Sequence, residues 1–145
     1  ATCKMEVGFT DAKDDAGAIN ALATPTFTAT DSAVWCYDTN DTGYWQCVGN
    51  DSGTAATKIE PTYFSGTATA APIADTYETL GVGLRKTEES GNICDAKFWR
   101  RDANGYKTYE SGWMEGACSS NVGLVPWVFV QLRAAVDRNV DIDFI

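Results

Sequence analysis

The stretch "KFWRRDANGYKTYESGW" (residues 97–113) predicts a β-hairpin and decides the fold class of the chain. Asn104-Gly105 stands between two arms that are rich in aromatic residues. This dipeptide favours a type I′ turn, because both of its positions then need positive φ. Aromatic side chains are also enriched in strands. The stretch therefore predicts two antiparallel strands joined by a tight turn.

The stretch "WCYDTNDTGYWQC" (residues 35–47) repeats this design. Trp35 precedes a polar turn as Trp99 does, and the pattern Asp-x-Asn occurs at both Asp38–Asn40 and Asp102–Asn104. We interpret the two stretches as two similar hairpins, since polar residues and Gly between apolar arms are typical of hairpin turns.

Both ends of the chain alternate between apolar and polar residues. The stretches are "CKMEVGF" (residues 3–9) and "NVDIDFI" (residues 139–145). A period of two residues is typical of a half-buried strand. The residues that share the apolar face are Cys3, Met5, Val7 and Phe9 at one end, and Val140, Ile142 and Phe144 at the other. Each end is predicted to be a strand.

The rest of the chain agrees with an all-β fold. Residues 124–132, "LVPWVFVQL", are apolar on both faces, as a central strand would be, although Pro126 could also begin a buried helix. Residues 11–25 could hold one short helix, capped by Asp14 or Asp15, with Ile19 and Leu22 facing inward. About eight to ten short strands and at most one helix predict a single all-β domain over residues 1–145, either a sandwich or a barrel.

Five cysteines predict that this domain is stapled by disulfides. Cys36 and Cys47 are equidistant from the centre of the first turn, so a symmetric hairpin would place them opposite each other. Cys94 and Cys118 bracket the second hairpin and are the next natural pair. Cys3 is then left over, and three interpretations are open: a bridge to another chain, a reactive thiol, or a buried thiol in the core.

Composition excludes several partners. The chain of 145 residues has a net charge of −9 and a pI of about 4.3, so it repels phosphate backbones and anionic lipid surfaces. No apolar run approaches the ~20 residues that a membrane helix needs. The start "ATC" and the cysteine content predict an exported protein, secreted or on the cell surface. We expect neither nucleic acid nor membrane insertion.

The chain contains no histidine, which removes Ser-His-Asp and Cys-His catalysis and imidazole metal sites. Its twenty Asp and Glu residues include no pair that the spacing singles out for acid and base roles. We therefore expect a protein without enzymatic activity and without a required cofactor.

The polar turn "DTNDTG" (residues 38–43) leaves three interpretations open. Asp38, Asn40 and Thr42 alternate ahead of a glycine, as oxygen ligands do in loop calcium sites, although the remainder of the EF-hand pattern is missing. Asn40 also begins an Asn-x-Thr glycosylation sequon, and Asn50 begins an Asn-x-Ser sequon. The third interpretation is a plain turn of residues that bond locally.

Two functional hypotheses follow. The leading one is a structural subunit that self-assembles into an extracellular fibre or surface layer, with the row Val140, Ile142 and Phe144 pairing with a neighbouring copy. The alternative is a monomeric carbohydrate-binding domain, in which Trp45 and Trp99 stack on sugar rings and calcium assists. Against the alternative, large aromatic residues also fill small β cores.

Overall fold

The computed structural model describes most of the chain, and every regular element within the described residues is a β-strand. The described residues are 2–12, 16–59, 61, 71–73, 75–87 and 91–133, with side chains left out at 55–57. The prediction of an all-β fold is confirmed. In this part of the chain, no helix has the length and hydrophobicity to cross a membrane.

The larger sheet has five antiparallel strands. Their order is β11 (Val125–Leu132), β1 (Cys3–Thr10), β4 (Ser32–Asp38), β5 (Trp45–Asp51) and β6 (Thr54–Ile59). The strand predicted over 124–132 is confirmed, but among the described strands it lies at the edge of this sheet rather than at its centre. β1 instead lies inside the sheet, paired with β11 on one side and β4 on the other.

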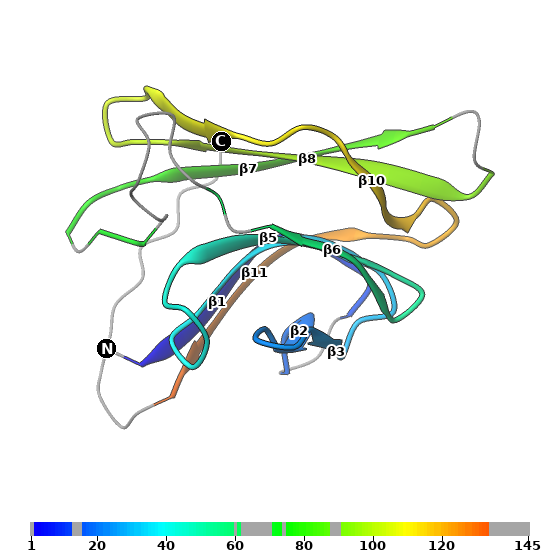
Figure 1. Cartoon of the computed structure of the whole chain (residues 1–145), viewed down its shortest axis with the longest axis horizontal. Coiled ribbons are helices and arrows are strands. Elements are labelled where there is room, and N and C mark those ends of the chain that lie inside the picture. The colour runs from blue at the N-terminus through cyan, green and yellow to red at the C-terminus, as the bar shows by residue number, and fades with distance from the viewer. Residues whose placement is uncertain are drawn as a thin grey trace.

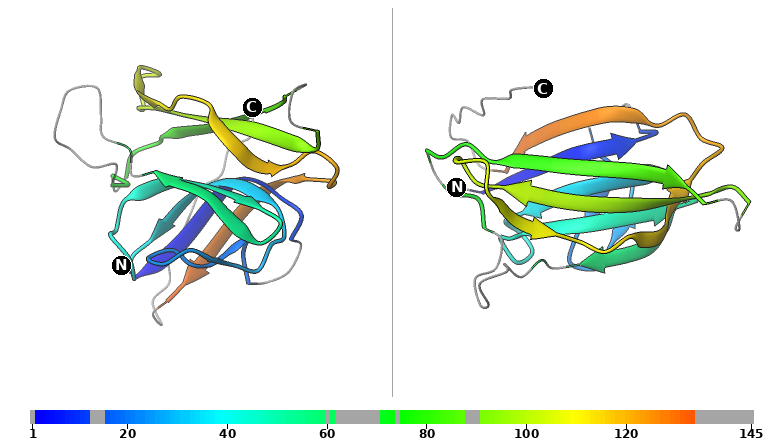
Figure 2. Two further views of the ribbon diagram at one scale, coloured as in Figure 1. Left: turned by 45° about the vertical axis from the view of Figure 1, so that its right-hand side comes forward. Right: turned by 90° about the horizontal axis from the view of Figure 1, so that it is seen from above.

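The smaller sheet consists of β10 (Met114–Ser119), β8 (Ile93–Arg101) and β7 (Thr79–Lys86), and β9 (Lys107–Glu110) also pairs with β8. The two sheets form separate layers that face each other, as Figure 1 and Figure 2 show, so the fold is a sandwich and not a closed barrel. A short hairpin of β2 (Ile19–Ala21) and β3 (Thr26–Phe27) lies below the larger sheet in Figure 1.

The core between the sheets is built around Trp35, whose side chain is fully buried. Its ring makes edge-to-face contacts with Trp45 at 6.5 Å, Phe98 at 5.7 Å and Tyr109 at 5.7 Å between centroids. Its Nε1 donates to the carbonyl of Gly81 at 3.1 Å. Residues from both sheets therefore meet on one aromatic side chain, which joins the layers.

The outer face of the larger sheet is covered as well. The β2–β3 hairpin packs there in a second cluster, whose buried members are Ile19, Leu22, Val34, Cys36 and Val48. The short helix predicted within residues 11–25 is wrong where the structure describes it, since β2 occupies 19–21. Ile19 and Leu22 are buried as predicted, while the proposed caps Asp14 and Asp15 lie outside the described residues.

The turn of the second hairpin differs from the predicted type. Only Gly105 has a positive φ, +81°, whereas a type I′ turn would also need one at Asn104. Asp102 organises the turn: its carbonyl accepts from Gly105 N at 2.9 Å, and its carboxylate accepts from Asn104 N at 2.9 Å and Tyr106 N at 3.0 Å. The side-chain bonds of Asp102 stabilise a longer turn that ends in glycine.

The first hairpin is shifted by one residue from the predicted register. Cys36 lies opposite Gln46, and Cys47 lies opposite Trp35. The side chain of Cys36 packs in the outer cluster and that of Cys47 in the core between the sheets. Successive residues point to opposite faces of a sheet, so this shift separates the thiols. The predicted Cys36–Cys47 disulfide is wrong for this reason.

Cys94 and Cys118 do lie directly opposite each other, on β8 and β10. All five cysteines belong to the described residues, and none forms a disulfide in the structure. The predicted disulfide staple is therefore absent here, including the bond between this pair. Cys3 lies half-buried on β1, opposite Leu132. The predicted carboxyl-terminal strand, with Val140, Ile142 and Phe144, lies outside the described residues.

Candidate functional site

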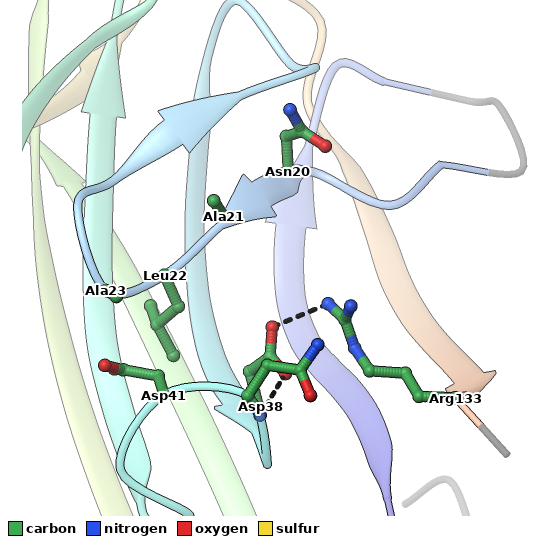
Figure 3. Close-up of a pocket in the computed structure, with 8 residues that line it drawn as sticks. Asn20, Ala21, Leu22, Ala23, Asp38, Asp41 and Arg133 are labelled. Carbon is green, nitrogen blue, oxygen red and sulfur yellow. Dashed lines mark hydrogen bonds and ion pairs between the residues drawn. The ribbon is translucent and has the colours of Figure 1, made fainter.

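The loop predicted to bind calcium is held together by protein groups. The carboxylate of Asp38 is almost fully buried and accepts from Arg133 Nη2 at 2.7 Å and from Asn40 N at 2.9 Å. Figure 3 shows the Arg133 guanidinium reaching Asp38 from the end of β11. An arginine already occupies the position that a cation would take beside this carboxylate.

The other oxygens of the loop are also engaged. Gln46 Nε2 donates to Thr42 Oγ1 at 2.8 Å and to Asp41 Oδ2 at 2.7 Å, and Lys58 Nζ lies 3.1 Å from the same Asp41 oxygen. Within the described ranges, no three acidic or thiol side chains gather as a metal-binding group. The plain-turn interpretation accounts for every one of these contacts, and calcium binding stays a prediction.

A small open pocket lies beside this loop, with a volume of about 130 Å³. It is lined by Asn20, Ala21, Leu22, Ala23, Asp38, Asn40, Asp41 and Arg133. The view in Figure 3 shows these residues coming from the β2 segment, the β4–β5 turn and the end of β11. Its charged groups are largely used in the contacts just described, so few remain to hold a ligand.

The two sequons have different surroundings. Asn40 is exposed at the β4–β5 turn, so a glycan there stays a prediction. Asn50 is fully buried, and its Nδ2, the atom that would carry a glycan, donates to Ala29 O at 2.9 Å. The folded chain has no room for a sugar on Asn50, and glycosylation there is wrong for the folded state.

The structure separates the two tryptophans that were predicted to stack on sugars. Trp45 is only 5% exposed and packs between Trp35 and Tyr37 in the core. Trp45 therefore cannot present a face to a ligand, and its predicted role is wrong. Trp99 lies on the side of its sheet that faces away from the core. Its neighbour in the chain, Phe98, is fully buried in the core, and successive residues of a strand point to opposite faces.

Trp99 lies against the backbone of the neighbouring strand. Gly81 and Gly83 of β7 face Trp99 and Lys97 of β8. A Cβ atom at Gly81 would come within 2.0 Å of Trp99 Cε2, and one at Gly83 within 3.2 Å of its Cζ3. The indole thus occupies the space that side chains at these two positions would fill. The alternation "GVG" therefore positions this ring.

A second tryptophan on this surface was not singled out from the sequence. Trp113 follows an interruption between β9 and β10 and is 38% exposed. The interruption is fixed by Ser111, whose N donates to Phe98 O at 2.8 Å and whose Oγ accepts from Phe98 N at 2.9 Å. Arg85 Cζ lies 4.2 Å and Lys97 Nζ 5.9 Å from the Trp113 ring centroid. The signal in the sequence was the break "SGW" in the hairpin arm.

Charges hold this surface in place. Arg85 donates to Asp95 Oδ2 from Nε at 3.1 Å and from Nη2 at 3.0 Å. Lys97 Nζ lies 2.5 Å from Glu110 Oε1, and Lys107 bonds the other Glu110 oxygen. Bonds from Lys107 and Lys97 lower the pKa of Glu110 to about 2, so its carboxylate remains charged in mildly acidic solution.

We call the surface formed by Arg85, Lys97, Trp99, Glu110 and Trp113 the outer aromatic face. It lies on the side of the smaller sheet that points away from the larger sheet, the side seen from above in the right panel of Figure 2. Comparison of the chain with protein-family models, with curated proteins and with solved structures found no match. Function must therefore be inferred from the structure itself.

Proposed function

We propose that the chain is an exported, non-enzymatic structural subunit, which assembles into an extracellular fibre or surface layer by pairing strands between copies. The observation that supports this proposal is the edge position of β11. Among the described residues, β11 pairs with β1 on one side and has no strand on the other. The unpaired backbone groups along such an edge form a template for another strand.

The sequence of β11 does little to protect this edge. Its eight residues, "VPWVFVQL", include no charged side chain, and Val130 and Leu132 are 36% and 43% exposed. Natural edge strands are commonly blunted by charged residues, bulges or proline, and β11 has only Pro126 near its start. An uncharged, exposed edge of this length favours pairing with a strand of the same kind.

The strand that would pair with this edge is the predicted one at residues 140–145 of a neighbouring copy. β1 already has a partner on each side, so it is not available for exchange between subunits. Main-chain hydrogen bonds would supply affinity, and the alternating row Val140, Ile142 and Phe144 would supply specificity. Each copy would donate one strand and accept another, and such head-to-tail contacts build open polymers.

Deletion of residues 140–145 tests the proposal. We expect the intact chain to form large polymers by size-exclusion chromatography with light scattering, and the shortened chain to be a folded monomer. Val130→Lys should likewise stop polymers, because a charge at an edge opposes strand pairing. Tyr77→Lys is the matched control: Tyr77 is 70% exposed but lies outside β11, so this variant should polymerise normally.

The opposite results would contradict the proposal. If the intact chain is a monomer at high concentration and the shortened chain unfolds, residues 140–145 belong to the fold of their own copy. If polymers persist in Val130→Lys, the subunits contact each other elsewhere than at β11.

A further inference from the structure

The outer aromatic face of the smaller sheet is open, unlike the outer side of the larger sheet. The β2–β3 hairpin covers the outer side of the larger sheet, whereas the described elements leave that of the smaller sheet uncovered in Figure 1. The face carries two tryptophans that are only partly buried: Trp113 is 38% exposed and Trp99 is half-buried. An exposed aromatic surface on a sheet indicates a place where something binds.

The arrangement along the face is ordered. Trp99 lies against the glycines of β7, Lys97 is two residues away on the same side of β8, and Arg85 and Trp113 follow beyond it. The glycines hold the Trp99 indole against the sheet, and the guanidinium of Arg85 lies over Trp113. Both rings are therefore positioned before any ligand arrives, which lowers the entropy cost of binding.

The face is close to neutral, although the chain as a whole is strongly acidic. Four cations, Arg85, Lys97, Arg101 and Lys107, lie on β7, β8 and β9. They balance the nearby carboxylates of Asp95, Asp102, Glu110 and Glu115, in a chain whose net charge is −9. Asp95 is also buried, with one oxygen bonded to Arg85 and the other accepting from Gly116 N at 3.2 Å.

The cationic groups remain accessible beside the rings. The side chains of Arg85, Lys107 and Lys97 are 47%, 42% and 30% exposed. Asp95 engages Nε and Nη2 of Arg85 and orients its guanidinium. An arginine fork can bind a further carboxylate with its remaining N–H groups, and lysine can do so from several directions.

We propose that the outer aromatic face binds a polysaccharide that carries carboxylate groups, a polyuronate. The apolar C–H faces of its pyranose rings would pack on Trp99 and on the part of Trp113 that Arg85 leaves exposed, and its carboxylates would pair with Arg85 and Lys97. An open face suits an extended chain. A nucleic acid fits less well, because its affinity depends on neutralising many phosphates and the cations of this face do not outnumber its carboxylates.

Titration of the full chain with defined polymers tests the proposal, with tryptophan fluorescence and calorimetry as readouts. We expect oligogalacturonate to bind and its methyl ester, which has the same rings without charge, to bind about tenfold more weakly. Polyglutamate, which has the charge without the rings, should bind at least as weakly as the ester. Binding of oligogalacturonate should weaken with added salt.

Variants assign the binding to the face. Trp113→Ala should weaken oligogalacturonate binding about tenfold, as loss of an aromatic anchor does, and Trp113→Phe should weaken it less. Lys97→Met should weaken binding of oligogalacturonate but not of its ester, while Lys107 still balances Glu110. Tyr106→Ala, at the exposed hairpin turn, is the matched control and should bind normally. Circular dichroism confirms that each variant is folded.

Four results would overturn the proposal. No binding of oligogalacturonate, or equal binding of polyglutamate, would mean that the face does not recognise acidic sugar rings. Equal binding of the methyl ester would make it a site for neutral glycans, and tighter binding of single-stranded DNA would make it a nucleic-acid site. Because β11 belongs to the other sheet, each result leaves the assembly proposal standing.

Discussion

At the scale of single residues, the most unexpected feature is a charge pair inside the protein. Lys4 and Glu6 are 1% and 0% exposed, and their charged groups are 2.8 Å apart. Glu6 also accepts from Ala18 N at 2.6 Å, Ile19 N at 3.0 Å and Trp127 Nε1 at 2.9 Å. These bonds replace the water that a buried carboxylate loses. Glu6 therefore ties the segment before β2 to the larger sheet.

Removing one member of this pair should strongly destabilise the fold. We expect Glu6→Gln to lower the free energy of unfolding by about 3–5 kcal/mol, because Lys4 is then a buried charge without a carboxylate. Urea unfolding measures the effect. The double variant Lys4→Met, Glu6→Gln should recover part of the loss, since it leaves no buried charge and keeps an amide oxygen that accepts from the buried N–H groups.

The matched control is Lys107→Met, which breaks an ion pair in which Lys107 is 42% exposed. Exposed pairs contribute about 0–1 kcal/mol, so this variant should unfold close to the wild type. A Glu6→Gln variant as stable as Lys107→Met would show that the Lys4 and Glu6 side chains reach solvent.

At the scale of strands and hairpins, register decides the chemistry of the cysteines. The β4–β5 hairpin is centred on Asp41, with Tyr37 opposite Trp45, and this places Cys36 and Cys47 on different faces. Gly43, with a φ of +71°, and the bonds from Asp41 N and Gly43 N to Asp38 O close the turn in that register. A turn one residue longer would have aligned the thiols.

On β8 and β10, the register places Cys94 directly opposite Cys118, and this pairing predicts a disulfide that forms on oxidation. Incubation with oxidised glutathione should join Cys94 to Cys118 and release two molecules of reduced glutathione, because thiols at directly opposed positions are close enough to bond. The bond should stabilise the fold by about 3 kcal/mol, as expected for a loop of this size. Peptide mapping without reduction identifies the pair.

Cys118→Ser is the control, and it should lose the stabilisation. Recovery of a Cys36–Cys47 peptide instead would mean that the β4–β5 register differs from the one described.

At the scale of the whole molecule, the two sheets and the β2–β3 hairpin enclose three thiols. Burial raises the pKa of Cys118 to about 12, and burial also raises the pKa of Cys36 and Cys47 well above their ordinary value of 9.0. A buried thiolate would lack the water that stabilises its charge. The folded state therefore keeps these thiols protonated at a pH where the unfolded chain releases the protons.

Alkaline pH should therefore destabilise the reduced protein. The stability that the protonated thiols contribute is complete below pH 9, the ordinary thiol pKa, and is lost as the pH rises toward 12, the pKa of folded Cys118. We expect the urea midpoint, measured with reductant present, to fall between about pH 9 and pH 11. Burial also raises the pKa of Tyr109, which acts in the same direction.

Replacing the thiols shows whether they cause the effect. Cys36→Ala, Cys47→Ala and Cys118→Ala together should make the midpoint less sensitive to pH, although less stable overall. An urea midpoint of the wild type that does not change up to pH 11 would mean that the thiols are hydrated in the folded state.

The sequence alone determined the all-β class, both hairpins and the strand character of residues 3–9, because alternation and turn residues act over a few neighbouring positions. It could not determine which strand faces were covered. Lys4 and Glu6 alternate as a solvent-facing row would, yet the β2–β3 hairpin buries them. Asn50 was likewise buried beneath a distant segment.

Tertiary structure alone decided the candidate sites. Trp45 and Trp99 flank similar turns in the sequence. In the fold, Trp45 packs against the opposite sheet, whereas Trp99 lies against the glycines of the neighbouring strand β7. Arg85 and Trp113 are 28 positions apart and meet only because β7 and β10 flank β8. Local residue patterns determine strands through backbone geometry, whereas burial and ligand contacts depend on which strands pack together, and that depends on the whole chain.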